Sequence, residues 1–189
     1  MDTYEMARIP VLIISGPVGI GKSSTAQAIS DILEWDYAWP HAVADLDYIR
    51  SAFPRPADDP FNMTMAFKNL AAIWLNYREA GARCLIIPSV MEHSTDLDRV
   101  RDAVPGADVF MVRLTASLAV NHDRIRRRET SDESLEWHLR RSTQLAEELA
   151  ASKLENLVVE TAQKTVATVA REILGYWGIV ESEGAELGR

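Results

Sequence analysis

Short apolar runs alternate with amphipathic segments along most of the chain. Five runs have the length of buried strands, at residues 9–15, 42–44, 84–87, 109–114 and 157–159. Between and after them, helical spacing or polar helix formers cover residues 22–33, 46–52, 62–80, 95–103, 117–128, 133–152 and 165–176. Because strands that alternate with helices form parallel sheets covered on both faces, the pattern predicts an α/β fold.

Breaks in the pattern mark the connections and the end of the ordered chain. Residues 53–60 contain Pro54, Pro56 and Pro60, which restrict the backbone and remove amide donors, so we expect a stiff loop there. A chain of 189 residues fits one α/β domain, which we place at residues 1–180. Residues 181–189 carry no apolar period, and we expect a disordered tail.

A glycine-rich turn joins the first predicted strand to the first predicted helix. Gly16-x-x-x-x-Gly21-Lys22-Ser23 fits the phosphate-loop pattern G-x-x-x-x-G-K-[ST] in the strand–turn–helix context that the pattern requires. The glycines allow main-chain N–H groups to turn toward phosphate oxygens, and the helix N-terminus favours the same anion. The alternative is a Gly-rich connection that carries Lys-Ser by chance.

The loop defines a set of predicted nucleotide-binding residues. They are Gly16, Pro17, Val18, Gly19, Ile20, Gly21, Lys22, Ser23 and Ser24. We expect Lys22 to reach the β- and γ-phosphates of ATP and Ser23 to contact Mg²⁺.

Two acids follow the second predicted strand. Asp45 and Asp47 lie where that strand ends and a helix begins, and in an open parallel sheet the carboxyl edge lines the ligand crevice. We expect Asp45 to contact Mg²⁺, and Asp47 to orient and deprotonate an acceptor hydroxyl. The alternative is helix capping, since Asp is a preferred residue before a helix.

The composition disfavours several classes of partner. The formal net charge of −8, from 20 basic and 28 acidic residues, disfavours a nucleic-acid-binding protein. Cys84 is the only cysteine and lies in an apolar stretch, which indicates a core thiol and suits a reducing cytoplasm. No apolar run approaches the length of a membrane span. We therefore expect a cytoplasmic protein without membrane partners, either a monomer or a homodimer.

The phosphate loop and the segment Asp45-Leu-Asp-Tyr-Ile-Arg50 together resemble the small P-loop kinases of the adenylylsulfate kinase, shikimate kinase and chloramphenicol phosphotransferase type. In adenylylsulfate kinases the second motif is D-G-D-N-V-R, which aligns with Asp45, Asp47 and Arg50. The resemblance implies a three-layer P-loop fold, with a five-stranded parallel sheet in the order 2-3-1-4-5 and a small helical lid at about residues 124–140. It also implies that Asp47 helps to activate the acceptor and that Arg50 binds an anionic or polar acceptor group.

A basic helix is predicted to form the start of the lid. Residues 121–129 carry four arginines in five positions, and Arg124 and Arg128 lie one helical turn apart. In the kinases that the chain resembles, a comparable Arg-x-x-x-Arg helix leads into the lid. We expect both arginines to stabilise charge on the transferred phosphoryl group. A solvated helix of mixed charge is the alternative.

Three further positions are weaker candidates. Thr161 follows the last strand in a turn that resembles the one at the edge of the adenine ring in these kinases. Asn69 belongs to a polar stripe with Asn62 and Asn76, which faces either the acceptor or, as we favour, solvent. Ser89, after the third strand, either touches the acceptor or caps a loop.

The leading hypothesis is an ATP- and Mg²⁺-dependent kinase that acts on a hydroxyl of a small molecule. An alternative is an ATP-binding regulatory switch with slow ATPase activity. A third is a kinase for polynucleotide ends or nucleotide-sugars, which the acidic composition disfavours. No N-K-x-D motif is present, so a GTPase switch is disfavoured.

Overall fold

A five-stranded parallel sheet forms the centre of the molecule. The computed structural model describes residues 8–180, so the predicted tail at residues 181–189 lies outside the described part. The sheet order is β2-β3-β1-β4-β5 and every neighbouring pair is parallel, as predicted. The strands are β1 (Ile9–Ser15), β2 (His41–Val43), β3 (Cys84–Pro88), β4 (Ala107–Thr115) and β5 (Leu157–Glu160).

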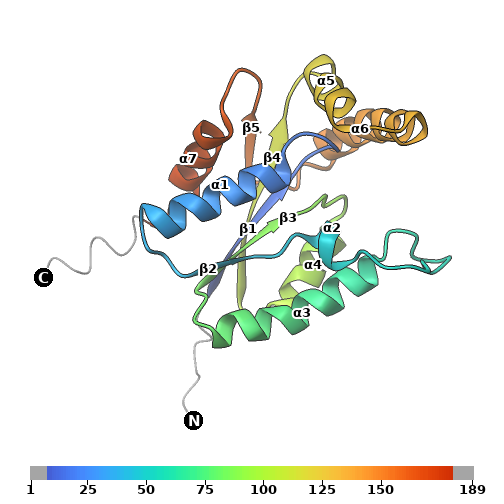
Figure 1. The fold of residues 1–189 in the computed structure, drawn as a ribbon. Helices are drawn as coiled ribbons and strands as arrows, with labels where there is room; N and C mark the ends of the chain where they lie inside the picture. Colours follow the sequence, from blue (N-terminus) through green and yellow to red (C-terminus); the bar gives the residue numbers. More distant parts are fainter. Residues whose placement is uncertain (1–7, 181–189) are drawn as a thin grey trace, which may run out of the picture.

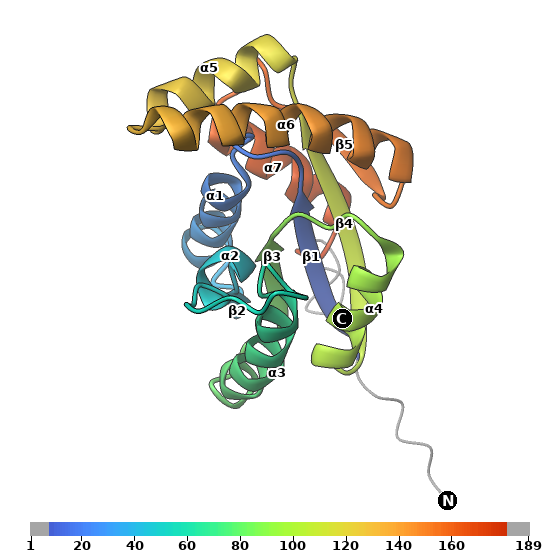
Figure 2. The ribbon, with the colours of Figure 1, turned by 90° about the vertical axis from the view of Figure 1, so that its right-hand side faces the viewer.

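Helices cover both faces of the sheet, which gives three layers (Figure 1). They are α1 (Lys22–Trp35), α2 (Leu46–Ile49), α3 (Met63–Glu79), α4 (Ser94–Ala103), α5 (Leu118–Arg128), α6 (Asp132–Ser152) and α7 (Val166–Trp177). Helices α1 and α7 pack on one face, and α3 and α4 pack on the other. Figure 2 shows α5 and α6 side by side across one end of the sheet. Among the helices of residues 8–180, none is long and apolar enough to cross a membrane.

The central strand β1 is buried on both faces because it lies between β3 and β4. Leu12 and Ile14 belong to the core beneath α1 and α7, whereas Val11 and Ile13 belong to the core beneath α3 and α4. All four side chains are fully buried. This two-sided burial explains why the strand is a continuous apolar run and not an alternating one.

Cys84, which the sequence indicated as a core thiol, is fully buried, and so is Trp74 of α3. Burial raises the pKa of the Cys84 thiol to about 12, so the sulfur stays protonated and inert at neutral pH.

Element boundaries agree with the prediction to within two residues, with one exception. The helix expected at residues 46–52 ends at Ile49. The Arg50 amide donates to the Leu46 carbonyl, and the side-chain amide of Asn62 then takes the carbonyls of Arg50 (3.1 Å) and Ala52 (3.2 Å). Because Asn62 supplies a donor from outside, the chain can leave the helix early without losing hydrogen bonds.

Candidate active site

The loop between β1 and α1 needs glycine at two close approaches. Gly16 has φ +143°, and a Cβ there would lie 2.7 Å from the Leu114 carbonyl oxygen. Gly19 has φ +81°, and a Cβ there would lie 2.5 Å from Cγ1 of Ile125 in α5. Neither the Leu114 backbone nor the fully buried Ile125 side chain can move aside cheaply, so the loop packs against β4 and α5 only because Gly16 and Gly19 have no side chain. The sequence pattern therefore forms the expected strand–turn–helix loop.

Lys22, the first residue of α1, bends back over the loop that precedes it. Its Nζ donates to the carbonyls of Gly16 (3.0 Å) and Pro17 (3.2 Å). Burial of the ammonium lowers the pKa of Lys22 to about 8, although Asp47 and Asp45 raise it in part. A desolvated cation held at a glycine-rich loop is suited to a polyanion such as a triphosphate.

Ser23 and Asp45 bring two oxygen ligands together beside the loop. The Ser23 hydroxyl donates to Oδ2 of Asp45 at 2.6 Å, and Oδ1 of Asp45 accepts from the Asp47 amide at 3.0 Å. Asp45 therefore caps α2, which was the alternative to a metal-binding role, and its other oxygen accepts the Ser23 hydroxyl. Within residues 8–180 no group of three or more His, Cys, Asp or Glu side chains could hold a metal by itself. The pair suits Mg²⁺, which is commonly held by one or two protein oxygens together with substrate phosphates and water.

Asp47 and Arg50 form an ion pair at opposite ends of the α2 turn. Arg50 Nη2 donates to Oδ1 of Asp47, while Nη1 donates to the Phe61 carbonyl (3.0 Å) and to Sδ of Met63 (2.9 Å). Arg50 thus connects α2 to the following loop and fixes one oxygen of Asp47. The Asp47 side chain is 51% exposed, so its carboxylate remains accessible from solvent.

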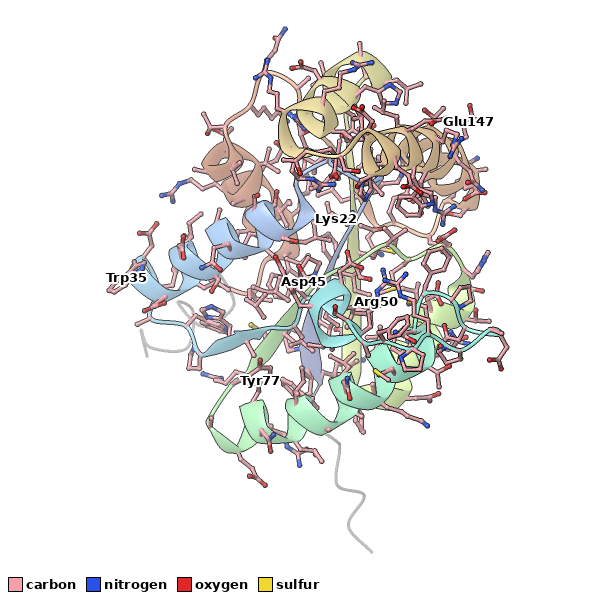
Figure 3. The ribbon with its side chains drawn as sticks, turned by 45° about the vertical axis from the view of Figure 1, so that its right-hand side comes forward. Lys22, Trp35, Asp45, Arg50, Tyr77 and Glu147 are labelled. Atoms are coloured by element: carbon pink, nitrogen blue, oxygen red, sulfur yellow. The ribbon has the colours of Figure 1, made fainter. Side chains whose placement is uncertain are left out.

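A cavity of about 1110 Å³ joins these groups. Lys22 and Ser23 line one end of it, and Asp47 and Arg50 line its wall. Figure 3 shows Lys22, Asp45 and Arg50 near one another at the centre of the molecule, whereas Trp35 and Glu147 lie at its periphery. The cavity thus lies at the carboxyl edge of the sheet, where α/β folds bind their ligands.

The two predicted lid arginines occupy different environments. Arg124 donates to the Ile20 carbonyl (3.2 Å), to the Thr161 hydroxyl (2.9 Å) and to the Thr161 carbonyl (3.2 Å). Arg128 is half-exposed and pairs with Glu129 at 2.7 Å. Both line the cavity, whereas Thr161 is buried behind Arg124. Arg124 therefore connects the phosphate loop to the turn after β5.

Asn121 is a site residue that the sequence analysis missed. It is 1% exposed, and its Nδ2 donates both to the Val18 carbonyl of the phosphate loop (2.9 Å) and to the hydroxyl of Ser142 in α6 (2.7 Å). Its Oδ1 is buried without a hydrogen-bond partner. The only sequence signal was its position one helical turn before Ile125, the residue that packs against Gly19.

Two of the weaker candidates do not line the cavity. Asn69 donates to the Ile49 carbonyl at 2.6 Å, so its amide holds α2 against α3 and does not face solvent as we favoured. Ser89 is 2% exposed, and its hydroxyl faces the Val90 carbonyl at 3.4 Å. Asn62 is buried and lines the cavity, whereas Asn76 is exposed, so the three asparagines do not share one environment. We therefore do not carry Asn69 or Ser89 into the acceptor site.

Helix α6 reaches across the cavity to the loop after β3. Arg141 donates to Glu92 at 2.5 Å. Nearer the start of α6, the Ser134 hydroxyl donates to Glu129 at 2.7 Å, and this bond and Arg128 lower the pKa of Glu129. These contacts connect α6 to the loop after β3 and to the end of α5.

Comparison with known proteins finds no matching family model and no matching curated protein. Solved structures match this chain over most of its length and of theirs. The tunicamycin resistance protein of Deinococcus radiodurans is 25% identical, with a TM-score of 0.61 over 90% of this chain and 96% of that one.

Two kinases are more distant in sequence. A gluconokinase from Sinorhizobium meliloti 1021 is 21% identical, with a TM-score of 0.59 over 96% of this chain and 99% of that one. The Mycobacterium tuberculosis APS kinase, solved with AMPPNP and APS, is 19% identical, with a TM-score of 0.56 over 89% of this chain and 96% of that one. The chain therefore has the fold of the P-loop small-molecule kinases, in agreement with the resemblance seen in its motifs.

Proposed function

We propose that the chain is an ATP- and Mg²⁺-dependent kinase that phosphorylates a hydroxyl of a small molecule. The observation that carries the proposal is that Lys22, Ser23 and the Asp47 carboxylate line one cavity. Phosphoryl transfer needs a phosphate site, a metal ligand and a base near the acceptor, and this cavity has residues suited to each role.

At the nucleotide end, the proposed roles follow from the contacts. Lys22 exchanges its two loop carbonyls for phosphate oxygens when the triphosphate is bound, because a charged partner is stronger than a neutral one. Ser23 and Asp45 hold the metal between them. Bound Mg²⁺ offsets negative charge on the phosphate oxygens.

At the acceptor end, Asp47 is the proposed base. Arg50 fixes its Oδ1, which leaves Oδ2 to accept a proton. Asp47 takes the proton of the acceptor hydroxyl as that oxygen bonds to the γ-phosphorus and the bond from the γ-phosphorus to ADP breaks. Arg124 and Arg128, from α5, are the proposed partners of the transferred group.

The neighbouring structures support a kinase and leave its acceptor open. Their names refer to tunicamycin resistance, gluconate and APS, which differ in size and charge. We also propose that residues 124–140 act as the lid, since Arg124, Arg128 and Trp137 of this segment line the cavity. Closure of such a segment excludes water during transfer.

The test is ATP-dependent phosphorylation across a broad panel of hydroxylated metabolites, nucleosides and antibiotics. Formation of ADP is followed by a coupled assay, and the phosphorylated product is identified by mass spectrometry. We expect at least one acceptor whose phosphorylation requires both Mg²⁺ and Lys22. A protein that binds Mg-ATP but transfers its phosphoryl group to no panel member contradicts the proposal.

A further inference from the structure

The charged side chains of the cavity are distributed unevenly between its two ends. We define the acceptor end as the cavity-lining residues in segments 47–64, 90–99 and 137–145, opposite the phosphate loop. With histidine counted as neutral, this end carries four arginines and five acids, and therefore one excess negative charge. These residues are Arg50, Arg55, Arg99, Arg141, Asp47, Asp58, Asp59, Glu92 and Asp96.

Three of the four arginines already have carboxylate partners. Arg50 pairs with Asp47 and also donates to the Phe61 carbonyl and the Met63 sulfur. Arg99 lies 3.7 Å from Asp96. The pairing leaves these guanidinium groups with little net attraction for a second anion.

Arg141 is the most enclosed of these cations. It lies 2.5 Å from Glu92 and 3.4 Å from Glu148, and its side chain is only 17% exposed. An anionic acceptor that approached this guanidinium would either share it with Glu92 and Glu148 or displace one of them. In both cases a carboxylate lies beside the new anion, which is unfavourable.

The remaining charges do not add an enclosed cation. Arg55 is exposed on the same proline-rich loop as the exposed Asp58. Asp59 accepts from the Met63 and Thr64 amides, both at 2.8 Å, so it caps the start of α3. A triphosphate in the phosphate loop adds further negative charge, which repels an anionic acceptor brought to Asp47.

Two aromatic side chains also line the cavity beside these charges. Phe61 and Trp137 are both 44% exposed and both line the cavity. The Arg141 guanidinium lies 6.0 Å from the centre of the Phe61 ring, and Trp137 lies one helical turn before Arg141 on α6. The stem of Arg141 and the two rings thus provide a flat surface for an apolar group.

From the pairing of the arginines and the two aromatic side chains we infer that the phosphoryl acceptor is an uncharged or cationic alcohol with an apolar portion, and not a small anion. The inference rests on the proposed function and specifies its substrate class. The hydroxyl reaches Asp47 while the apolar portion packs on Phe61 and Trp137. Phosphorylation then gives the neutral molecule a phosphate monoester, whose negative charge favours release from this end of the cavity.

Three isosteric alcohols test the charge requirement directly. They are 4-(hydroxymethyl)benzamide, 4-(hydroxymethyl)benzylamine and 4-(hydroxymethyl)benzoate, which share one ring and one hydroxyl. We expect the neutral and cationic probes to bind the AMPPNP–Mg²⁺ form at least about tenfold more tightly than the benzoate in calorimetry, and to be phosphorylated correspondingly faster from ATP. Equal or tighter binding of the benzoate, or binding of none of the three, overturns the inference.

The binding readout separates this inference from the proposed function. A protein that binds the benzamide in the predicted order but transfers no phosphoryl group to any alcohol contradicts the kinase assignment alone. A protein that phosphorylates anionic alcohols in preference to neutral ones retains the kinase assignment and refutes the substrate class.

Substitutions test which residues determine the binding of these probes. Phe61→Ala and Trp137→Ala should each weaken benzamide binding several-fold, whereas Phe53→Ala, on the same loop but 94% exposed and not lining the cavity, should not. Glu92→Gln removes the nearest partner of Arg141 and should bring benzoate binding closer to that of the benzamide. No change in benzoate binding in Glu92→Gln contradicts the claim that pairing blocks anion binding.

Discussion

Main-chain groups form most of the nucleotide end of the cavity, whereas side chains form most of the acceptor end. At the nucleotide end, the loop is held by Asn121 and Arg124 through the carbonyls of Val18 and Ile20. At the acceptor end, Asp47 depends on a single guanidinium, that of Arg50, which also holds the neighbouring loop. A phosphate is the same in every kinase reaction, so a backbone site suffices for it, while the acceptor must be recognised by residue identity.

Among substitutions at the two ends of the cavity, we expect the largest loss of activity at Lys22. Lys22→Ala removes the one ammonium placed over the loop and should lower the rate of phosphoryl transfer by about 10²-fold or more. The measurement is ADP formation with the best acceptor of the panel, with circular dichroism to check folding. Near-normal turnover in a folded variant would remove the nucleotide end from the mechanism.

Asp47 should separate chemistry from nucleotide binding. Asp47→Asn keeps the side-chain shape and removes the base, so turnover should fall by about 10²-fold while the affinity for ATP changes little. Calorimetry with AMPPNP and steady-state kinetics provide the two values. Asp102→Asn is the matched control, because Asp102 is exposed on α4 and does not line the cavity. An equal loss of nucleotide affinity in Asp47→Asn would make Asp47 a metal or folding residue.

Asn121 tests whether the nucleotide end is held from α5 and α6. Asn121→Ala leaves the half-buried Val18 carbonyl and the buried Ser142 hydroxyl without this partner, which should cost about 1–3 kcal/mol of unfolding free energy. It should also weaken AMPPNP binding several-fold, since the loop is less well held. Gln144→Ala, on the exposed face of α6, is the control. Loss of stability without loss of nucleotide affinity would limit Asn121 to a folding role.

The smallest predicted effect is the pH dependence of the stability that Lys22 contributes. Because burial lowers the pKa of Lys22 from 10.5 to about 8, the unfolded chain binds more protons than the folded one between these values. The contribution of Lys22 to stability is therefore lowest below pH 8 and rises as the pH increases from 8 to 10.5. Denaturant titrations of wild type and Lys22→Met across this range measure the difference. A difference that falls with increasing pH would show the opposite shift.

A bound polyanion should reverse this shift, because it favours the charged lysine. At pH 8.5, triphosphate binding should take up a fraction of one proton, and at pH 6.5 it should take up none through Lys22. Calorimetry in buffers of different ionisation enthalpy gives the number. Lys22→Arg, which stays protonated throughout, should abolish the proton uptake at pH 8.5.

Local patterns in the sequence predicted the sheet and the phosphate loop. The apolar run of β1 and the spacing from Gly16 to Ser23 depend on neighbouring residues alone, so they can be recognised without tertiary contacts. The short α2 could not be predicted, because its early end depends on Asn62, 12 residues beyond Arg50. Asn121 was missed for the same reason, since its partner Val18 is 103 positions away.

Side-chain partners also limited the prediction at the acceptor end. The motif resemblance suggested that Arg50 binds the acceptor, and nothing in the sequence indicated that Asp47, Phe61 and Met63 already occupy its donors. Asn69 looked like a polar surface residue, and only the fold shows that it meets the Ile49 carbonyl. Which polar groups remain free is a property of tertiary packing that residue spacing does not encode.

Helix α6 places Arg141 and Ser142 next to each other in the chain. Arg141 contacts Glu92 beside the acceptor, and Ser142 contacts Asn121, which holds the phosphate loop. A displacement of this one helix by either ligand therefore reaches the other. If the acceptor raises the affinity for the nucleotide, the nucleotide must raise the affinity for the acceptor by the same factor. The order in which the two ligands are added therefore cannot change the final occupancy.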